Sequence, residues 1–208
     1  MSAPHGIVLG AGKGLRFGGP KVLAPWPIGD AFEPLGVAHL RARAKDCARV
    51  VLVARRGHVD ELLLSRLPPR TALVCSDEPE DHGPAGSIAA ALLHLSPRAG
   101  DWLLLTPVDL PPADLSVVAA LLEAVAAHPG SAAARPRSGG RGGHPVLVRA
   151  ELLVEAYRSG RPPLREVLAA PAVGLLDVAV EDPDVLRDFD AAADLATYLE
   201  VRARTTRT

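Results

Sequence analysis

A glycine-rich segment with three cationic side chains is the first part of the chain whose residue types could do chemistry. Residues 10–21 read GAGKGLRFGGPK, with five glycines in twelve positions. Glycine lets a backbone turn sharply and bring its N–H groups against a ligand, and clustered N–H groups bind anions. Lys13, Arg16 and Lys21 add positive charge. The segment contains two of the three lysines of the whole chain, which lie at positions 13, 21 and 45. The segment therefore predicts a phosphate-binding loop.

Two common phosphate-loop motifs do not fit this segment. A dinucleotide fingerprint G-x-G-x-x-G would need glycine where the chain has Leu15 or Phe17, which disfavours a dinucleotide-dependent oxidoreductase. A Walker A loop needs Ser or Thr directly after its lysine, whereas Gly14 and Val22 follow the two lysines here. The loop is of another kind, or it is a flexible surface turn with solvated charges.

A carboxylate that follows a run of apolar residues is the second candidate. Residues 103–112 read LLLTPVDLPP, so Asp109 lies at the carboxyl end of an expected strand. Ligands of open α/β sheets bind at this edge. A lone carboxylate there suits Mg²⁺, which takes one or two protein carboxylates and completes its shell with phosphate oxygens and water. The alternative is that Asp109 caps the following helix, although Asp114 is nearer to that position.

Two more aspartates lie late in the chain, in the sequence RDFD at residues 187–190. Asp188 and Asp190 alternate in an expected extended stretch, and we expect one to face inward if the other faces outward. The alternative for Asp190 is that it forms the N-cap of a closing helix that begins at Ala191.

Short apolar runs and helical patterns alternate along the chain. Continuous apolar runs suit strands of a parallel sheet that is covered on both faces. This order predicts an α/β fold with an open, mostly parallel sheet and helices on both faces. The expected strands are residues 6–9, 49–54, 71–75, 102–106, 131–134, 145–148 and 174–180. The expected helices are residues 30–44, 59–66, 84–95, 113–128, 150–157, 163–169 and 191–201.

Length, charge and composition exclude several other classes of protein. The 208 residues, 48% of them hydrophobic, predict a single domain over 1–201 and a flexible tail over 202–208. Lys+Arg 23 against Asp+Glu 24 argues against a dedicated nucleic-acid or membrane binder. No apolar run approaches the roughly 18 residues of a membrane helix, and no signal peptide is visible. Cys47 and Cys75 form no disulfide framework, so we expect a cytoplasmic protein.

Several segments, in order along the chain, resemble motifs of the molybdenum cofactor nucleotidyltransferase family. Residues 9–21 are similar to its L-A-A-G-x-G-x-R-M-G-x-x-K signature, with Gly10 in place of an alanine. The segment TPVDLP is similar to the metal-binding aspartate motif of that family. Two stretches resemble its cytidylyltransferase-like branch: GPAGSI at 83–88 matches a G-x-x-x-S-[LI] helix start, and GHPVLV at 143–148 matches a G-H-P-[VI]-L-[VF] strand.

The closing motif of the family, D-x-D-T-P-x-D, is similar to residues 188–194 but not identical. Asp188, Asp190 and Asp194 match its three aspartates, whereas Ala191 and Ala192 replace Thr-Pro. The resemblance implies a three-layer α/β/α Rossmann-like fold. It also implies transfer of a nucleoside monophosphate from an NTP to an acceptor phosphate such as that of molybdopterin, with release of pyrophosphate.

The resemblance also assigns roles to individual residues. It implies catalytic roles for Arg16, Lys21 and Asp109, and a Mg²⁺ site made by Asp109 with Asp188 or Asp190. The acceptor is expected near the glycine-rich and basic residues 136–144, at Arg141 and His144, unless that segment is simply a basic surface loop. The implied nucleotide-binding residues are Leu9, Gly10, Ala11, Gly12, Lys13, Gly14 and Ser87.

Three readings of the function stay open. Ser87 and the GHPV stretch favour CTP as the nucleotide, but the guanylyltransferase branch carries a related G-P-x-x-G-I helix start, of which residues 82–88 satisfy a part. The missing Thr-Pro motivates a third reading, a nucleotide-binding domain that has kept the fold and lost turnover. The oligomeric state is left open.

Overall fold

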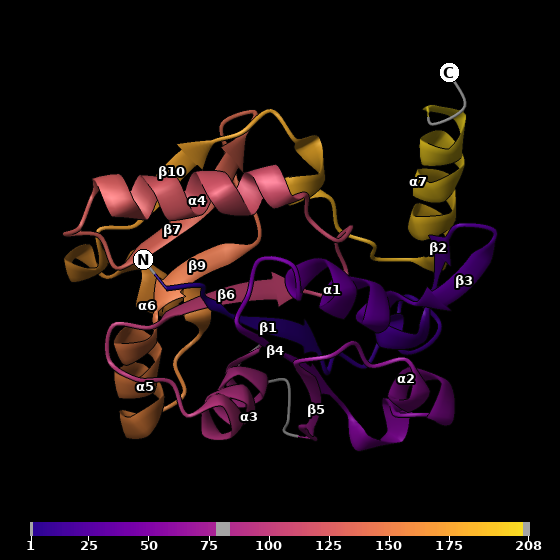
Figure 1. The fold of residues 1–208 in the computed structure, drawn as a ribbon, viewed down its shortest axis with the longest axis horizontal. Helices are drawn as coiled ribbons and strands as arrows, with labels where there is room; N and C mark the ends of the chain where they lie inside the picture. Colours follow the sequence, from indigo (N-terminus) through magenta and orange to yellow (C-terminus); the bar gives the residue numbers. More distant parts are fainter. Residues whose placement is uncertain (1, 78–83, 206–208) are drawn as a thin grey trace.

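The computed structural model describes residues 2–77 and 84–205, which form a central sheet with helices on both sides (Figure 1). The strand order is β10-β7-β9-β6-β1-β4-β5, and β8 pairs with β7. The strands of this sheet are β1 (His5–Gly10), β4 (Arg49–Ala54), β5 (Thr71–Cys75), β6 (Trp102–Pro107), β7 (Ala133–Ser138), β8 (Arg141–Gly142), β9 (Val146–Arg149) and β10 (Leu176–Ala179).

Most neighbouring strands run in parallel, as the sequence predicts. Strand β1 pairs in parallel with β4 and β6, and β4 pairs in parallel with β5. Strands β9 and β8 are the exceptions: β9 runs antiparallel between β6 and β7, and the short β8 pairs antiparallel with β7. The carboxyl ends of β1 and β6 therefore lie next to each other, and the loops that follow them meet at one edge of the sheet.

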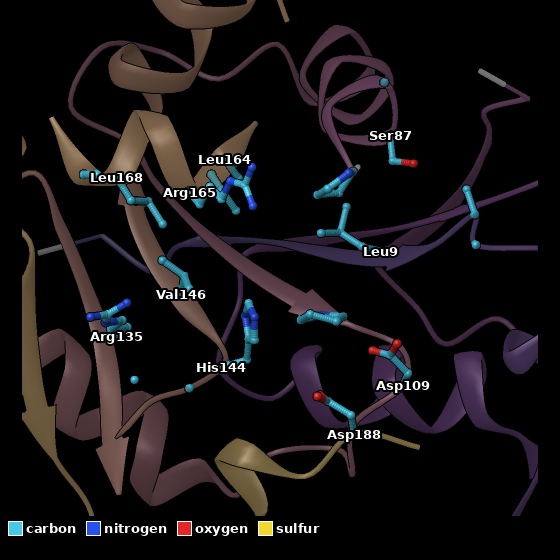
Figure 2. Close-up of a pocket in the computed structure, with 18 of the residues that line it drawn as sticks. Leu9, Ser87, Asp109, Arg135, His144, Val146, Leu164, Arg165, Leu168 and Asp188 are labelled. Carbon is cyan, nitrogen blue, oxygen red and sulfur yellow. The ribbon is translucent and has the colours of Figure 1, made fainter. Parts of the chain in front are cut away.

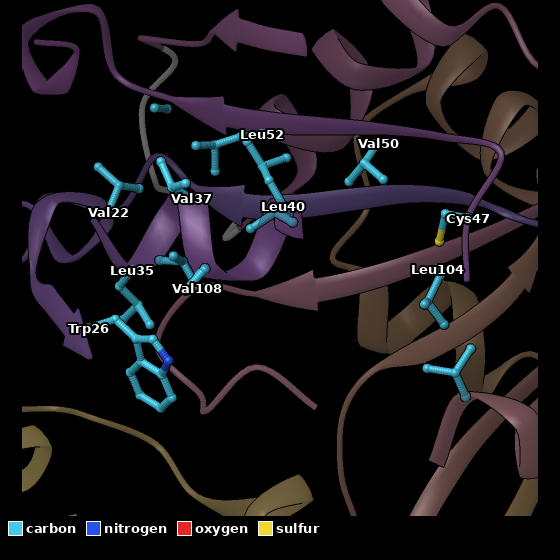
Figure 3. Packing of buried hydrophobic residues seen from close by; sticks show 14 of the residues in the cluster. Val22, Trp26, Leu35, Val37, Leu40, Cys47, Val50, Leu52, Leu104 and Val108 are labelled. Atoms are coloured by element: carbon cyan, nitrogen blue, oxygen red, sulfur yellow. The ribbon is translucent and has the colours of Figure 1, made fainter. Parts of the chain in front are cut away.

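The two faces of the sheet bury separate hydrophobic clusters. In β4, Val50 and Leu52 point into one cluster while Val51 and Val53 point into the other, because successive side chains of a strand face opposite sides. Figure 3 shows the first cluster, in which Val50 and Leu52 pack with Leu40 and Leu104. The predicted three-layer α/β/α architecture is thereby confirmed.

Each cluster is closed by its own set of helices. Helices α1, α4 and α7 contribute side chains to the first cluster, and α3, α5 and α6 contribute to the second. In the part of the chain that the structure describes, no helix combines the length and the apolar character needed to cross a membrane. The helices are α1 (Leu35–Arg43), α2 (Glu61–Ser65), α3 (Ala85–Leu95), α4 (Leu115–Ala127), α5 (Ala150–Ser159), α6 (Leu164–Ala169) and α7 (Ala192–Thr205).

The helix expected over residues 30–44 is wrong in its first part. Residues 25–34 form a separate two-stranded hairpin, β2 (Pro25–Ile28) and β3 (Ala31–Pro34), before α1 begins at Leu35. The hairpin buries the Trp26 side chain against the first cluster, and Pro34 lies inside the expected helix, where it disfavours helix continuation and immediately precedes α1. Tertiary burial and proline therefore override the helical pattern.

The closing helix is longer than expected at its end. Helix α7 continues through Thr205, beyond the predicted end at residue 201. Residues 206–208 lie outside the described part of the chain, so the flexible tail over 202–208 stays a prediction.

Helix α1 carries two fully buried polar side chains that hold the loop after β6. The His39 ring, at Nε2, lies 2.9 Å from the carbonyl oxygen of Leu110. One turn later, Arg43 donates from Nη2 to the carbonyl oxygen of Ala113 and forms a 3.2 Å ion pair with Asp46. Burial lowers the pKa of His39 from 6.5 to about 4, so the ring is neutral at pH 7 and donates its Nε2 proton to Leu110.

We expect His39 to make the stability of the fold pH-dependent. Since the folded pKa lies below the unfolded value, the unfolded chain binds the proton first, and stability falls as the pH drops from 6.5 toward 4. Urea unfolding at pH 7.5 and pH 5 measures this loss. The His39→Gln variant, which keeps an N–H donor without a titratable ring, should lose roughly 2 kcal/mol less than the parent protein over that interval. Parallel losses in the two proteins would contradict this role.

Candidate active site

The glycine-rich segment forms a compact turn after β1. The Gly14 carbonyl oxygen accepts hydrogen bonds from the backbone N–H groups of Gly18 and Gly19, at 3.0 and 3.2 Å. Gly14 has φ of +64°, and a side chain there would overlap the Gly19 carbonyl group, so this position requires glycine. The turn leads directly into a short 3₁₀ segment, Lys21–Leu23, which places Lys21 beside the sheet edge.

The departure from the family signature at Gly10 has a steric reason. A methyl group on Gly10 would overlap the Val22 side chain, which is fully buried in the first cluster. The chain therefore combines glycine at the end of β1 with valine after Lys21, and this pairing brings the two ends of the loop close together.

An ion pair joins the two segments that sequence reasoning singled out first. The Lys21 ammonium lies 3.0 Å from a carboxylate oxygen of Asp109, and both side chains are partly buried. Asp109 lies two residues after the end of β6, and the Val108 N–H donates to the Leu9 carbonyl oxygen at 3.0 Å. The parallel pairing of β1 with β6 thus brings the loop and the carboxylate together. Asp114, and not Asp109, caps helix α4, since its carboxylate accepts the Ser116 N–H at 2.8 Å.

The late aspartates lie at the same place. The Phe189 N–H donates to the Asp109 carbonyl oxygen at 2.7 Å, which ties the segment to the loop after β6. Asp188 and Asp190 both line the cavity described below, so the expectation that they would face opposite ways is wrong. Residues two apart in extended chain share a face, and it is the intervening Phe189 that points into the core, 1% exposed.

The electrostatics of this carboxylate group favour a cation. Burial raises the pKa of Asp188, and repulsion by Asp109 and Asp190 raises it further, while Lys21 and Arg141 act in the opposite direction. In residues 2–77 and 84–205, no set of three or more His, Cys, Asp and Glu side chains is arranged to hold a metal ion by itself. Carboxylate oxygens in a partly buried site are donors that suit a hard cation.

Aromatic packing fixes the Asp188–Asp190 segment from behind. The Phe189 ring lies 5.4 Å from the Tyr198 ring of α7, which stacks on Trp26 of the hairpin at 6.0 Å. The Tyr198 hydroxyl donates to the Asp184 carboxylate at 2.6 Å. The Tyr198 ring therefore joins the Asp188–Asp190 segment to the hairpin, which is remote from it in sequence.

The start of α7 is held by Asp194, the third aspartate of the closing motif. Its carboxylate accepts the Ala191 N–H at 2.7 Å, and its own N–H donates to the Ala191 carbonyl oxygen at 3.1 Å. The first bond is one half of a capping box with Ala191 at the N-cap position, and the second is a backbone turn, because alanine has no side-chain acceptor to complete the box. The alternative role of Asp190 as the N-cap is therefore wrong, and its side chain faces the cavity instead.

Two adjoining hollows contain almost all the predicted site residues. The larger, of about 870 Å³, is lined by Leu9, Ala11, Gly12, Ser87, Asp109, His144, Asp188 and Asp190 among others, and Figure 2 shows how most of them face it. The smaller, of about 270 Å³, is lined by Gly10, Lys13, Gly14, Arg16 and Lys21. Both hollows share Leu9, Gly12, Asp109 and Asp190.

The two predicted acceptor residues, His144 and Arg141, differ in whether they line the cavity. His144 lines the larger cavity, and burial lowers its pKa, with the Asp109 charge acting in the opposite direction. Arg141 does not line either hollow; it lies on the exposed strand β8, near enough for its charge to act on Asp188. Gly83, the first residue of the expected helix-start motif, lies outside the described residues, as does His82.

Sequence reasoning missed one whole wall of the larger cavity. Arg135 lies on β7, and helix α6 contributes Leu164, Arg165 and Leu168. No motif marks these residues, because the aliphatic spacing of α6 is typical of any helix that packs on a sheet. These residues reach the cavity through the sheet order, in which β9 lies between β6 and β7.

Comparison with solved structures supports the fold. The chain superposes with a TM-score of 0.75 on the crystal structure of a homologue of Mycobacterium tuberculosis Rv0371c from Mycobacterium sp. strain JC1, at 23% identity and covering 97% of each chain. The structure of Mycobacterium tuberculosis Rv0371c in complex with manganese gives a TM-score of 0.69 at 21% identity, covering 96% of this chain and 99% of that one.

Sequence comparison identifies the family. A probable molybdenum cofactor guanylyltransferase from Rhodopirellula baltica is 36% identical over 112 residues, which are 54% of this chain and 50% of that protein. The matched stretch thus spans half the length of that relative. The MobA-like NTP transferase domain matches residues 6–173, most of the sheet and the cavity included. The chain therefore belongs to the MobA-like NTP transferase family, which confirms the predicted kinship with the molybdenum cofactor nucleotidyltransferases.

Proposed function

We propose that this protein is a Mg²⁺-dependent nucleotidyltransferase. It would move a nucleoside monophosphate from an NTP to the phosphate of a molybdopterin-type acceptor, and CMP is the nucleotide that we favour. The observation that carries the proposal is the Lys21–Asp109 ion pair of 3.0 Å, set between the glycine turn and the Asp188–Asp190 segment. Such a juxtaposition of backbone N–H groups, a cation and carboxylates suits a reaction that depends on positioning and charge neutralisation.

The loop residues would bind the triphosphate. Backbone N–H groups of residues 12–14 would face its oxygens in the smaller hollow, with Lys13 and Arg16 alongside. An oxygen of the acceptor phosphate attacks the α-phosphorus. The bond between the α-phosphorus and the oxygen that bridges it to the β-phosphorus breaks. Pyrophosphate leaves with the bonding electron pair. Arg16 would neutralise the leaving pyrophosphate, and Lys21 would neutralise charge on the α-phosphate.

The carboxylates fit a hard divalent cation. Asp109 would hold it, with Asp188 or Asp190 as a second ligand, because all three offer oxygen donors. Burial, and then repulsion by Asp109 and Asp190, raises the pKa of Asp188, and a bound cation would relieve that repulsion. A bound Mg²⁺ would neutralise phosphate charge during the transfer. Lys21 would release Asp109 to the metal and turn to the phosphate.

The remaining predicted residues concern specificity. His144 lines the cavity and Arg141 lies nearby on β8, so the two are proposed to face the acceptor. Ser87, in the first turn of α3, also lines the cavity and would meet the base of the nucleotide. The cytidylyltransferase-like motifs around Ser87 and His144 support CTP. A guanylyltransferase is the second candidate, supported by the name of the Rhodopirellula baltica relative.

Pyrophosphate release with each of the four NTPs, Mg²⁺ and molybdopterin tests the proposed activity. We expect turnover with CTP above GTP, and a loss of at least about 100-fold in Asp109→Asn while the fold survives. Asp114→Asn is the matched control, since asparagine keeps the helix cap. Nucleotide binding without release across a panel of phosphorylated acceptors would instead identify a silent domain, and unchanged turnover in Asp109→Asn would refute the metal role.

Lys21→Ala should lower kcat more than it raises KM for the NTP, by roughly 100-fold in kcat, because the ammonium acts on charge that develops during transfer. Lys45→Ala, which removes an exposed lysine two residues after the end of α1, serves as the control. A rise in KM with kcat unchanged would assign Lys21 to ground-state binding of the nucleotide.

The Phe189→Leu substitution should weaken divalent-metal binding even though the side chain of residue 189 does not contact the ion. The smaller side chain loosens the packing on Tyr198 that fixes the flanking aspartates, so we expect the Mn²⁺ dissociation constant, measured by titration of free Mn²⁺, to rise about tenfold. Leu195→Ala removes packing from the same cluster on α7 and is the control for general destabilisation. Equal Mn²⁺ affinities of parent and Phe189→Leu would contradict the role.

A further inference from the structure

Helix α1 packs at its start against the segment that carries Lys21. The Leu35 N–H donates to the Ala24 carbonyl oxygen at 2.8 Å, directly after the 3₁₀ segment Lys21–Leu23. Figure 3 shows Leu35 and Val22 in the same buried cluster, so the helix also contacts the 3₁₀ segment through side chains. The first turn of α1 therefore supports the cation of the ion pair from the core side.

The same helix holds the loop that carries Asp109, and it does so at two points. The His39 ring lies 2.9 Å from the Leu110 carbonyl oxygen, and Arg43, one turn later, donates to the Ala113 carbonyl oxygen. Two prolines lie between these carbonyl groups, and a proline has no N–H to donate. Because the segment has so few backbone donors of its own, side chains of α1 fix it instead.

Arg43 is a costly residue for this position. Its side chain is fully buried, and its guanidinium pairs with Asp46 at 3.2 Å. The attraction within a buried ion pair roughly offsets the free energy of removing both charges from water, so such a pair contributes little net stability. What the guanidinium does provide is a donor that reaches from α1 to the Ala113 carbonyl group, which an apolar side chain of the same length cannot supply.

We propose that α1 sets the relative position of Lys21 and Asp109, and that Arg43 is a positioning residue for the Asp109 carboxylate. Arg43 lines neither hollow, so it acts through the Ala113 carbonyl group and the loop after β6. The inference rests on the proposed function, in which Asp109 holds the cation. Since the first turn of α1 keeps Lys21 in place, loss of Arg43 displaces one partner of the ion pair and leaves the other.

The Arg43→Met/Asp46→Asn double variant tests the inference. Methionine is long and has no donor, and asparagine removes the charge that would otherwise be buried without its partner. Because both charges are removed together, we expect a urea unfolding midpoint close to that of the parent protein. The Mn²⁺ dissociation constant, measured by titration of free Mn²⁺ without nucleotide, should rise about tenfold, because the loop that holds Asp109 has lost one support.

Two further measurements distinguish positioning from a structural role. Turnover with CTP should show a kcat about tenfold lower and a KM for the nucleotide within about twofold of the parent, because the displaced carboxylate acts during the transfer. Hydrogen exchange of the amides of residues 102–115 should become faster in the double variant, while exchange in β4 stays as in the parent. Arg43→Lys keeps the charge and a donor, and should bind Mn²⁺ only about threefold more weakly than the parent.

Leu63→Ala is the control for general destabilisation. It removes packing from the same cluster, from helix α2, and Leu63 lines neither hollow. We expect a lower urea midpoint and an unchanged Mn²⁺ dissociation constant. If Leu63→Ala weakens Mn²⁺ binding as much as the double variant does, the effect is general destabilisation and the inference is overturned.

The outcomes separate this inference from the proposed function. Equal Mn²⁺ affinity and equal exchange in the parent and the double variant overturn the role of Arg43, and the proposed function stands. If the parent binds Mn²⁺ but releases no pyrophosphate, the transfer activity fails, and the Mn²⁺ and exchange measurements still decide the role of Arg43. If the parent binds no Mn²⁺, the metal role of Asp109 fails and the inference fails with it. If the double variant does not fold, Arg43→Lys decides, and parent-like Mn²⁺ affinity in that variant overturns the inference.

Discussion

The backbone of Asp109 is the point on which the rest of the site depends. Hydrogen bonds connect its neighbour Val108 to Leu9 of β1 and its own carbonyl oxygen to Phe189, so two segments remote in sequence meet the loop after β6. From below, His39 holds the next carbonyl group along the chain, that of Leu110. Each bond satisfies a backbone group that burial would otherwise leave unpaired. The loop after β6 is consequently fixed from three sides while its carboxylate stays free to face the cavity.

That rigidity matters because the site concentrates charge of one sign. Burial raises the pKa of Asp188, and repulsion by the neighbouring Asp109 and Asp190 raises it further. A flexible loop would relax by moving the carboxylates apart. Because the backbone holds the carboxylates in place, Lys21 neutralises them only in part. The group therefore keeps a net negative charge. The same scaffold thus stabilises the fold and holds the carboxylates where we propose that the cation binds.

Much of this arrangement was predictable from the sequence, and the reasons are local. Apolar runs such as 49–54 and 102–106 specify buried parallel strands, and strand order then places Gly12, Lys21 and Asp109 at one edge. The hairpin at Trp26 and the cavity wall on α6 were not predictable, because they depend on tertiary packing that leaves no periodic signal. The common orientation of Asp188 and Asp190 could have been predicted from the sequence. The apolar phenylalanine between them indicates which face is buried, and both aspartates lie on the opposite face.

The missing Thr-Pro shows how packing replaces a local constraint. Proline restricts φ of its own residue, and Ala191 and Ala192 provide no such restriction. In this chain the reciprocal hydrogen bonds of Asp194 order the start of α7, and the Phe189 ring, packed on Tyr198, orders the segment before it. Trp26 completes the support from the hairpin. The aspartates still line the cavity, so the loss of the motif's proline does not by itself argue for a nucleotide-binding domain without turnover. In this chain the aromatic contacts supply the constraint that proline would place on the backbone.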